Sequence, residues 1–162
     1  MGEVSPLNRL YPQFRGKGFE FFTIYVREPH PGEHYHEHRT WEEKVQYARD
    51  CRAQDAIETP LLVDDLNRAV HRAYGEMPNM VYIVDKQVKI VYKALWTDPA
   101  EIESVLDNLV MAEEMAARGV RVRPSYTEKL SYVAGYGQEV REKVLIRAGP
   151  KARHDLDTAF GR

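Results

Sequence analysis

The sequence contains a single cysteine, Cys51, and lacks any run of about 20 apolar residues that would span a bilayer. One cysteine excludes an internal disulfide and a C-x-x-C motif. The formal net charge is −2, and Lys and Arg are scattered along the chain, so no basic face indicates nucleic acid or an anionic membrane as partner. The first residues also lack the apolar segment of a signal peptide. We therefore expect a cytoplasmic protein with no membrane or nucleic-acid partner.

The composition is that of a globular protein, with 43% hydrophobic and 30% charged residues in 162. A chain of this length buries the core of one ordinary domain and leaves room for an appendage. We place the domain at residues 1–118 and the appendage, a C-terminal extension or arm, at residues 119–162.

Helices and strands alternate along the domain according to the spacing of its apolar residues and its turn signals. The expected elements are a helix over 5–15, a strand over 19–26, a loop over 27–39, a helix over 40–54, a strand over 59–65, a short helix over 66–74, a hairpin of 80–85 with 88–92, and a helix over 98–118. This order predicts an α/β fold with a parallel crossover pair, an antiparallel hairpin and covering helices, which is the thioredoxin-type order. In the extension we expect one helix, over about 127–133 or on to 147, followed by a polar end.

Two groups capable of acid/base chemistry follow the first apolar strand directly. Glu28 and His30 lie in the exit loop, two residues apart. In open α/β sheets, ligands bind in the crevice at the carboxyl ends of the strands, where a carboxylate and an imidazole are suited to proton transfer. The alternative is that both side chains only hydrogen-bond the backbone of the loop.

The segment Tyr25-Val-Arg-Glu-Pro-His-Pro31 resembles the strand end of the iodothyronine deiodinase-like branch of the thioredoxin-fold redoxins. Other landmarks agree in order and spacing: His38-Arg39 before an acidic helix, Pro60-Leu-Leu-Val-Asp64, and Pro78-Asn-Met-Val-Tyr-Ile-Val-Asp85. The resemblance covers roughly residues 5 to 110. It implies a thioredoxin-like central sheet and a reductive chemistry in which a cysteine or selenocysteine attacks the substrate. It also implies catalytic, proton-transferring roles for Glu28, His30 and His38.

The nucleophile of that family is missing from this sequence. In the family it ends a strand just before the first helix, whereas here the chain starts at Met1-Gly-Glu-Val-Ser-Pro6. Cys51 is no substitute, because it lies deep in a predicted helix rather than at a helix N-terminus, where the dipole would lower the pKa of a thiol. We therefore interpret the chain as an N-terminally truncated, degenerate or incomplete oxidoreductase. The rival from another class is a non-enzymatic binding or assembly module.

The loop over 27–39 also contains His34 and His36, interleaved with glutamates. Imidazole and carboxylate together suit a divalent metal ion, so these two histidines are an alternative metal site; a solvated loop and no cofactor is the simpler interpretation. Pro78 stands where thioredoxin-like folds place a cis-proline, as the resemblance implies. The alternative for Pro78 is a proline at the entry to a strand.

A thioredoxin-type sheet without its central strand leaves two facing edges, one at the strand over 19–26 and one at the strand over 80–85. Unpaired buried backbone groups cost about 1–3 kcal/mol each, so the chain must close up, recruit its own tail or pair with another copy. We expect a homo-oligomer, with residues 119–162 exchanged between subunits, and a further protein or a small molecule as partner.

Overall fold

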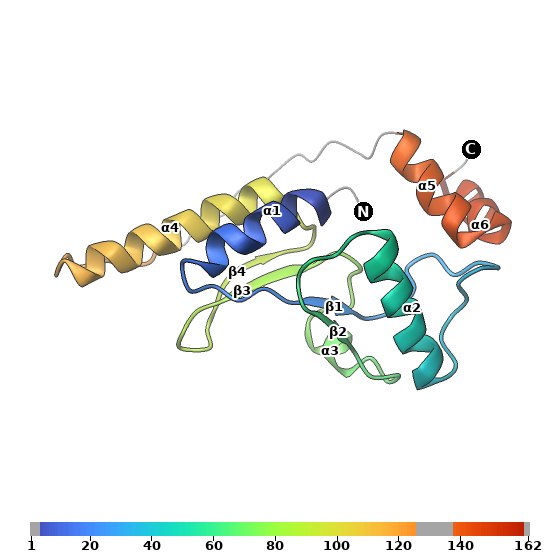
Figure 1. Ribbon diagram of the computed structural model, residues 1–162, viewed down its shortest axis with the longest axis horizontal. Coiled ribbons are helices and arrows are strands. Elements are labelled where there is room, and N and C mark those ends of the chain that lie inside the picture. The colour runs from blue at the N-terminus through green and yellow to red at the C-terminus, as the bar shows by residue number, and fades with distance from the viewer. Residues whose placement is uncertain (1–3, 126–137, 161–162) are drawn as a thin grey trace.

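The computed structural model describes residues 4–125 and 138–160 (Figure 1). The protein is a mixed α/β structure, as the sequence predicts. Its elements in chain order are α1 (Val4–Arg15), β1 (Thr23–Tyr25), α2 (Trp41–Gln54), β2 (Leu61–Val63), α3 (Ala69–Ala73), β3 (Val81–Val84), β4 (Ile90–Ala94), α4 (Pro99–Ala117), α5 (Gln138–Ala148) and α6 (Pro150–Phe160).

The strands of the described segments form two separate two-stranded sheets rather than one central sheet. β1 pairs in parallel with β2, with Thr23 opposite Leu61, and β3 pairs antiparallel with β4, with Val81 opposite Ala94. The crossover pair and the hairpin are therefore as predicted. No backbone ladder joins β1 to β3 in the part of the chain that the structure describes.

A shared apolar core holds the two sheets together. Its centre is Leu10 and Phe14 of α1 with Ile102 and Leu106 of α4, each at most 3% exposed. Side chains from the segment that leads into β1 and from the second sheet pack on this cluster: Phe19 and Phe21 before β1, Val81 and Ile83 of β3, and Tyr92 of β4. Figure 1 shows α1 and α4 side by side along the same side of the strands. Two helices thus bridge strands that are not hydrogen-bonded to one another.

Side-chain caps start the two longest helices of the domain. The Thr40 hydroxyl accepts a hydrogen bond from the Glu43 backbone N–H at 3.2 Å, and the Glu43 carboxylate accepts one from the Arg39 N–H at 2.7 Å. The Asp98 carboxylate accepts one from the Ala100 N–H at 2.9 Å, ahead of Pro99. These bonds satisfy donors that a helix N-terminus leaves free, which is why the capping patterns located both helices in the sequence.

The strand predicted over 19–26 is shorter and less buried than expected. Only residues 23–25 are in the ladder, and Ile24 is 40% exposed. To continue the parallel pattern toward Phe21, the residue at position 60 would have to donate an N–H, and Pro60 has none. The Thr23 N–H donates to the Pro60 carbonyl at 2.9 Å, and the ladder ends there.

The expectation of a cis-proline at Pro78 is wrong, because none of the described peptide bonds is cis. The trans isomer of an X–Pro bond is the more stable one by about 0.5–1 kcal/mol. Met77 and Pro78 are both exposed, so no packing around them favours the cis form.

The C-terminal extension differs from its prediction. Residues 127–133, where the expected helix begins, lie outside the described residues, and α5 occupies 138–148. The predicted polar end is instead a second helix, α6. Gly149, at φ +107°, ends α5, and Pro150 occupies the first position of α6. The two helices pack on each other through Leu145, Ala148 and Ala152, all at most 5% exposed. Because only a few apolar residues make these contacts, the apolar periodicity that predicts a helix is weak in this polar segment.

No helix within residues 4–125 and 138–160 has the length and apolar character needed to cross a membrane.

The shared core predicts a large loss of stability for Leu10→Ala. Leu10 is fully buried, so its truncation should cost about 2–5 kcal/mol through lost transfer energy and a cavity. Met111→Ala on α4, where the side chain is 48% exposed, is the control and should change stability by less than about 0.5 kcal/mol. Urea unfolding measures both. Equal effects of the two variants would show that α1 and α4 do not form the core.

Candidate functional site

The predicted acid/base residues Glu28 and His38 meet at the hydroxyl of Tyr25, the last residue of β1. The Tyr25 hydroxyl lies 3.1 Å from Glu28 Oε2 and 3.0 Å from His38 Nε2. The His38 ring also packs against Tyr25, with ring centroids 5.5 Å apart. The strand therefore ends in a three-residue network, and two of the three predicted site residues belong to it.

Proton counting restricts how this network is arranged. A phenol has one hydrogen, so when the Tyr25 O–H donates to ionised Glu28, His38 Nε2–H must donate to the Tyr25 oxygen. When Glu28 is protonated and donates to the Tyr25 oxygen, the Tyr25 O–H points to a bare His38 Nε2. Two protons, each moving by one bond, convert the first arrangement into the second, and the net result is one proton passed from a doubly protonated His38 to Glu28. The geometry is that of a proton relay between a carboxylate and an imidazole.

Burial sets the protonation preferences in this network. It raises the pKa of Glu28, although Arg147, the Tyr25 hydroxyl and the His30 backbone N–H oppose the shift. Burial lowers the pKa of His38, with the nearby Lys44 cation acting in the same direction. Burial, together with the Glu28 carboxylate, raises the pKa of Tyr25. Both titrating ends of the relay are thus shifted toward their neutral forms.

His30, the third predicted residue, lies apart from the relay. Its backbone N–H supports the Glu28 carboxylate, and burial lowers the pKa of its ring. The ring lines a different hollow, of about 190 Å³, between the loop and α6. The residues around that hollow are Pro29, His30, Pro31, Ala152, Asp155, Leu156 and Ala159. Glu28 and His38 therefore share a site, and His30 contributes its main chain to it.

His34 and His36 have separate partners. His34 Nδ1 lies 3.1 Å from the Arg147 carbonyl oxygen, and His36 Nε2 lies 3.2 Å from Glu43 Oε1. Within the described residues, no group of three or more His, Cys, Asp or Glu side chains is placed to hold a metal ion. The loop-histidine metal site stays a prediction without support from these contacts.

Three further residues next to the relay were not predicted from the sequence. Arg147 of α5 pairs with Asp55 at 3.2 Å, and the two side chains are only 16% and 13% exposed. Cys51, one helical turn before Asp55, lies 3.5 Å from Asp55 Oδ2. The i, i+4 spacing of Cys51 and Asp55 on α2 was visible in the sequence. Nothing in it indicates Arg147, which is 92 residues from its partner.

The surroundings of Cys51 favour an unreactive thiol. Burial raises its pKa, the Asp55 carboxylate adds to the shift, and Arg147 opposes it. A thiol with a raised pKa has little thiolate near neutral pH and reacts slowly.

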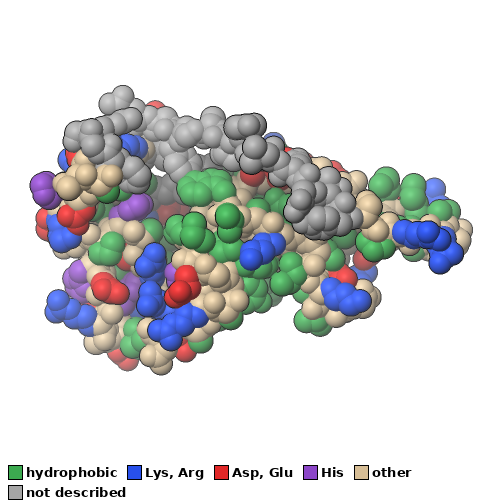
Figure 2. Space-filling view, turned by 180° about the vertical axis from the view of Figure 1, so that it is seen from behind, with side chains coloured by type: hydrophobic (Ala, Val, Ile, Leu, Met, Phe, Trp, Pro, Cys, Tyr) green, Lys and Arg blue, Asp and Glu red, His purple; other side chains and the backbone are tan. Residues whose placement is uncertain are grey.

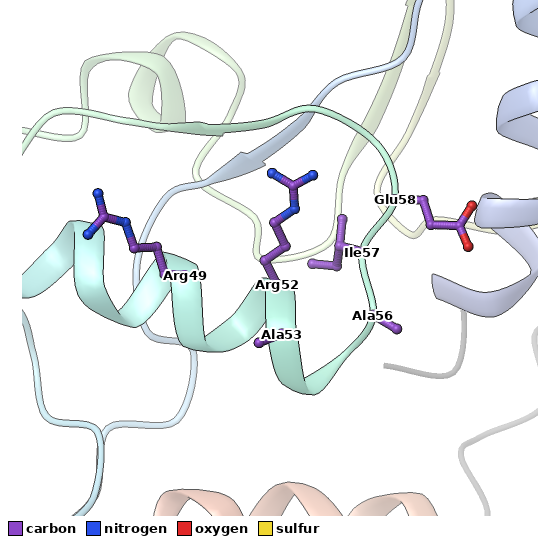
Figure 3. A pocket seen from close by; sticks show the side chains of 6 residues that line it. All are labelled: Arg49, Arg52, Ala53, Ala56, Ile57 and Glu58. Atoms are coloured by element: carbon purple, nitrogen blue, oxygen red, sulfur yellow. The ribbon is translucent and has the colours of Figure 1, made fainter.

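A larger open hollow, of about 700 Å³, lies at the end of α2 and contains none of the predicted site residues. Figure 3 shows the guanidinium groups of Arg49 and Arg52 on the same side of α2, with the Glu58 carboxylate directed away from them. Ala53, Ala56 and Ile57 complete its lining. The predicted residues Glu28 and His38 lie in the Tyr25 network and not in this hollow.

No protein-family model matches this chain, and no curated protein matches it either.

The raised pKa of Glu28 makes the effect of Glu28→Gln dependent on pH. A carboxyl with a raised pKa contributes stability that is complete below its unfolded-state pKa and is lost as pH rises through the folded-state pKa. Gln imitates the protonated form at every pH. Relative to wild type, the variant should therefore gain stability as the pH rises from about 4 to about 8. Thermal unfolding at both pH values measures the difference. Glu37→Gln, at an exposed position of the same loop, is the control. A Glu28→Gln effect that is the same at both pH values would contradict the assignment.

Proposed function

We propose that this protein is a thioredoxin-fold redox protein of the iodothyronine deiodinase-like type, in which Tyr25, Glu28 and His38 form the proton-transfer part of the site. The observation that carries the proposal is the relay itself. Its two titrating ends are joined by one hydroxyl at the carboxyl end of a parallel strand, which is where α/β folds bind ligands.

The order of elements supports the same assignment. A helix, a parallel crossover pair, a hairpin and a covering helix follow one another as the resemblance implies. Figure 1 shows the N-terminus of α1 at the same end of the molecule as the carboxyl end of β1. In the family that the sequence resembles, the nucleophile lies just before this helix. The relay is therefore on the correct side of the molecule to serve it.

In the proposed reaction a thiolate or selenolate attacks the substrate and a leaving group departs with the bonding electron pair. Protonated Glu28 gives its proton to that leaving group. His38 then takes up a proton from solvent, and a proton passed on through Tyr25 restores Glu28. A positioned general acid contributes about 10²–10⁴-fold to such a step. Cys51 is the only cysteine in the sequence and has a raised pKa, so the proposal requires that the nucleophile come from outside these 162 residues. The substrate is a small molecule with a bond that such a nucleophile cleaves.

Ser5→Cys in a Cys51→Ser background tests the proposal by placing one thiol in the first turn of α1, where the helix dipole favours a thiolate. With a hydroperoxide as substrate, the thiolate forms an S–O bond and the O–O bond breaks. This leaves a sulfenic acid and an alkoxide that is protonated, and dithiothreitol reduces the sulfenic acid. We expect turnover that Glu28→Gln lowers at least about tenfold and Glu37→Gln leaves unchanged. Equal turnover with and without Glu28→Gln would overturn the proposal.

A second candidate function, a self-associating interaction module, has its own supporting observation. Phe22 just before β1, Ile24 of β1 and Leu62 beside Ile24 are 59%, 40% and 47% exposed. By strand alternation they lie on the face opposite Phe21 and the α1–α4 core. Figure 2 shows hydrophobic side chains gathered in the middle of the face seen from behind. Among the described residues this apolar face is exposed and β1 pairs only with β2, which favours association with another copy.

Light scattering at low micromolar concentration tests this candidate. We expect a dimer that dissociates on dilution, and Phe22→Lys should shift it to monomer because a charge then sits on the apolar face. Ile146→Lys, at a position that is 68% exposed on α5, is the control and should leave the dimer intact. A monomer over the whole concentration range would eliminate this candidate.

A further inference from the structure

The helical pair α5–α6 sits on the loop that contains the relay residues. The His34 ring and backbone N–H approach the carbonyls of Arg147 and Ala148 at 3.1 and 3.4 Å. Arg147 passes over the Tyr35 ring, 5.1 Å from its centroid, and reaches Asp55 on α2. The C-terminal part of the chain therefore contacts two segments near Glu28: the loop over 27–39 and the C-terminal end of α2.

Two glycines allow this contact by letting backbones approach closely. A Cβ on Gly32 would lie 2.0 Å from the Ala148 carbonyl oxygen and 2.7 Å from its carbon. A Cβ on Gly149 would lie 2.3 Å from Glu33 Oε2, and Gly149 also has φ +107°. The Gly32 contact is against backbone, so no side chain can move aside to relieve it.

Glu33 caps the N-terminus of α6. Its two carboxylate oxygens accept the Lys151 backbone N–H at 2.8 and 2.9 Å. Pro150 has no N–H, so Lys151 offers the first free donor of this helix, and a carboxylate there is favoured by the helix dipole. The body of the protein thus supplies the cap for a helix of the extension.

Hydrogen bonds and an ion pair contribute to this contact. The groups that make them are Glu33, the His34 ring and backbone, and the Arg147–Asp55 pair. The helices α5 and α6 also pack on each other, and Leu145, Ala148 and Ala152 are buried. They are also tied by the ion pairs Arg141–Asp157, at 2.6 Å, and Arg153–Glu142. Such a unit keeps its internal contacts when it separates from the loop.

We propose that α5–α6 is a detachable cover of the Tyr25–Glu28–His38 site, delivering Arg147 when docked and withdrawing it when released. This inference deepens the proposed function, on which its catalytic meaning rests. Arg147 is a positioning residue here. In the docked state its guanidinium lies beside Cys51 and Asp55, and its positive charge opposes the rise in the pKa of Glu28. A substrate reaches the relay when the cover is displaced.

Gly32→Ala in the full-length chain is the test, because its methyl group enters the space of the Ala148 carbonyl and forces the cover off. Two readouts follow the displacement. Cys51 should react with a thiol reagent at neutral pH at least tenfold faster, because exposure of the thiol removes the largest cause of its raised pKa, which is burial, and this outweighs the loss of the opposing Arg147 cation. The Lys151 amide, freed from Glu33, should exchange its hydrogen at least tenfold faster, while the amides of α1 and α4 keep their protection.

Gly16→Ala is the matched control, because its nearest neighbour would be the Pro12 carbonyl at 3.7 Å, an ordinary contact. Glu33→Gln is a second, milder variant that weakens the cap without a steric change and should accelerate the same two readouts by a smaller factor. Unchanged rates of Cys51 labelling and Lys151 hydrogen exchange in both variants would contradict the proposal that α5–α6 is a detachable cover. Neither readout needs catalysis, so a failure of the proposed redox function would leave this result standing, and the reverse also holds.

Discussion

The contact between α1 and α4 is the interaction on which the rest of the structure depends. Leu10 and Phe14 from one helix meet Ile102 and Leu106 from the other, and apolar residues of the hairpin and of the segment leading into β1 pack around them. Because the sheets share no ladder in the described part of the chain, burial of apolar surface replaces backbone hydrogen bonding as the force that sets their relative position. The ion pairs that accompany this contact, Arg9–Glu103 and Lys17–Asp107, are exposed and add little.

The candidate site differs from this apolar core, because polar groups are buried there without full charge compensation. Glu28 has two hydrogen-bond donors and a cation nearby, and burial still raises its pKa. A second polar cluster behaves as a purely structural one: Asp64 accepts the backbone N–H groups of Asp65, Val70 and His71 at 2.9–3.0 Å, and its pKa is lowered. The opposite shifts of these two carboxyls follow from their surroundings: burial dominates at Glu28, whereas three backbone N–H groups stabilise the ionised form of Asp64.

Local signals in the sequence located most elements correctly. Thr40 and Asp98 mark helix starts that the structure confirms, because a capping side chain acts on residues two or three positions away. Glu28, His30 and His38 are predicted together as one site; Glu28 and His38 meet at Tyr25, whereas His30 lies at a different hollow. Tyr25 was counted as strand core, yet its hydroxyl joins the pair. The Arg147–Asp55 contact and the α6 helix depend on contacts between segments far apart in the sequence. Local sequence patterns do not indicate such contacts. The strand over 19–26 was overestimated because apolar periodicity ignores the missing N–H of Pro60.

Two sheets held by side chains alone can move in a way that a continuous sheet cannot. A hydrogen-bond ladder fixes strand register in steps of one residue, whereas apolar packing tolerates sliding of a fraction of an ångström without breaking a bond. The β1–β2 unit carries Tyr25 at its end, and the hairpin β3–β4 lies beyond the shared core. Shear along the α1–α4 contact would therefore shift the Tyr25 hydroxyl relative to the hairpin, with no cost in backbone pairing.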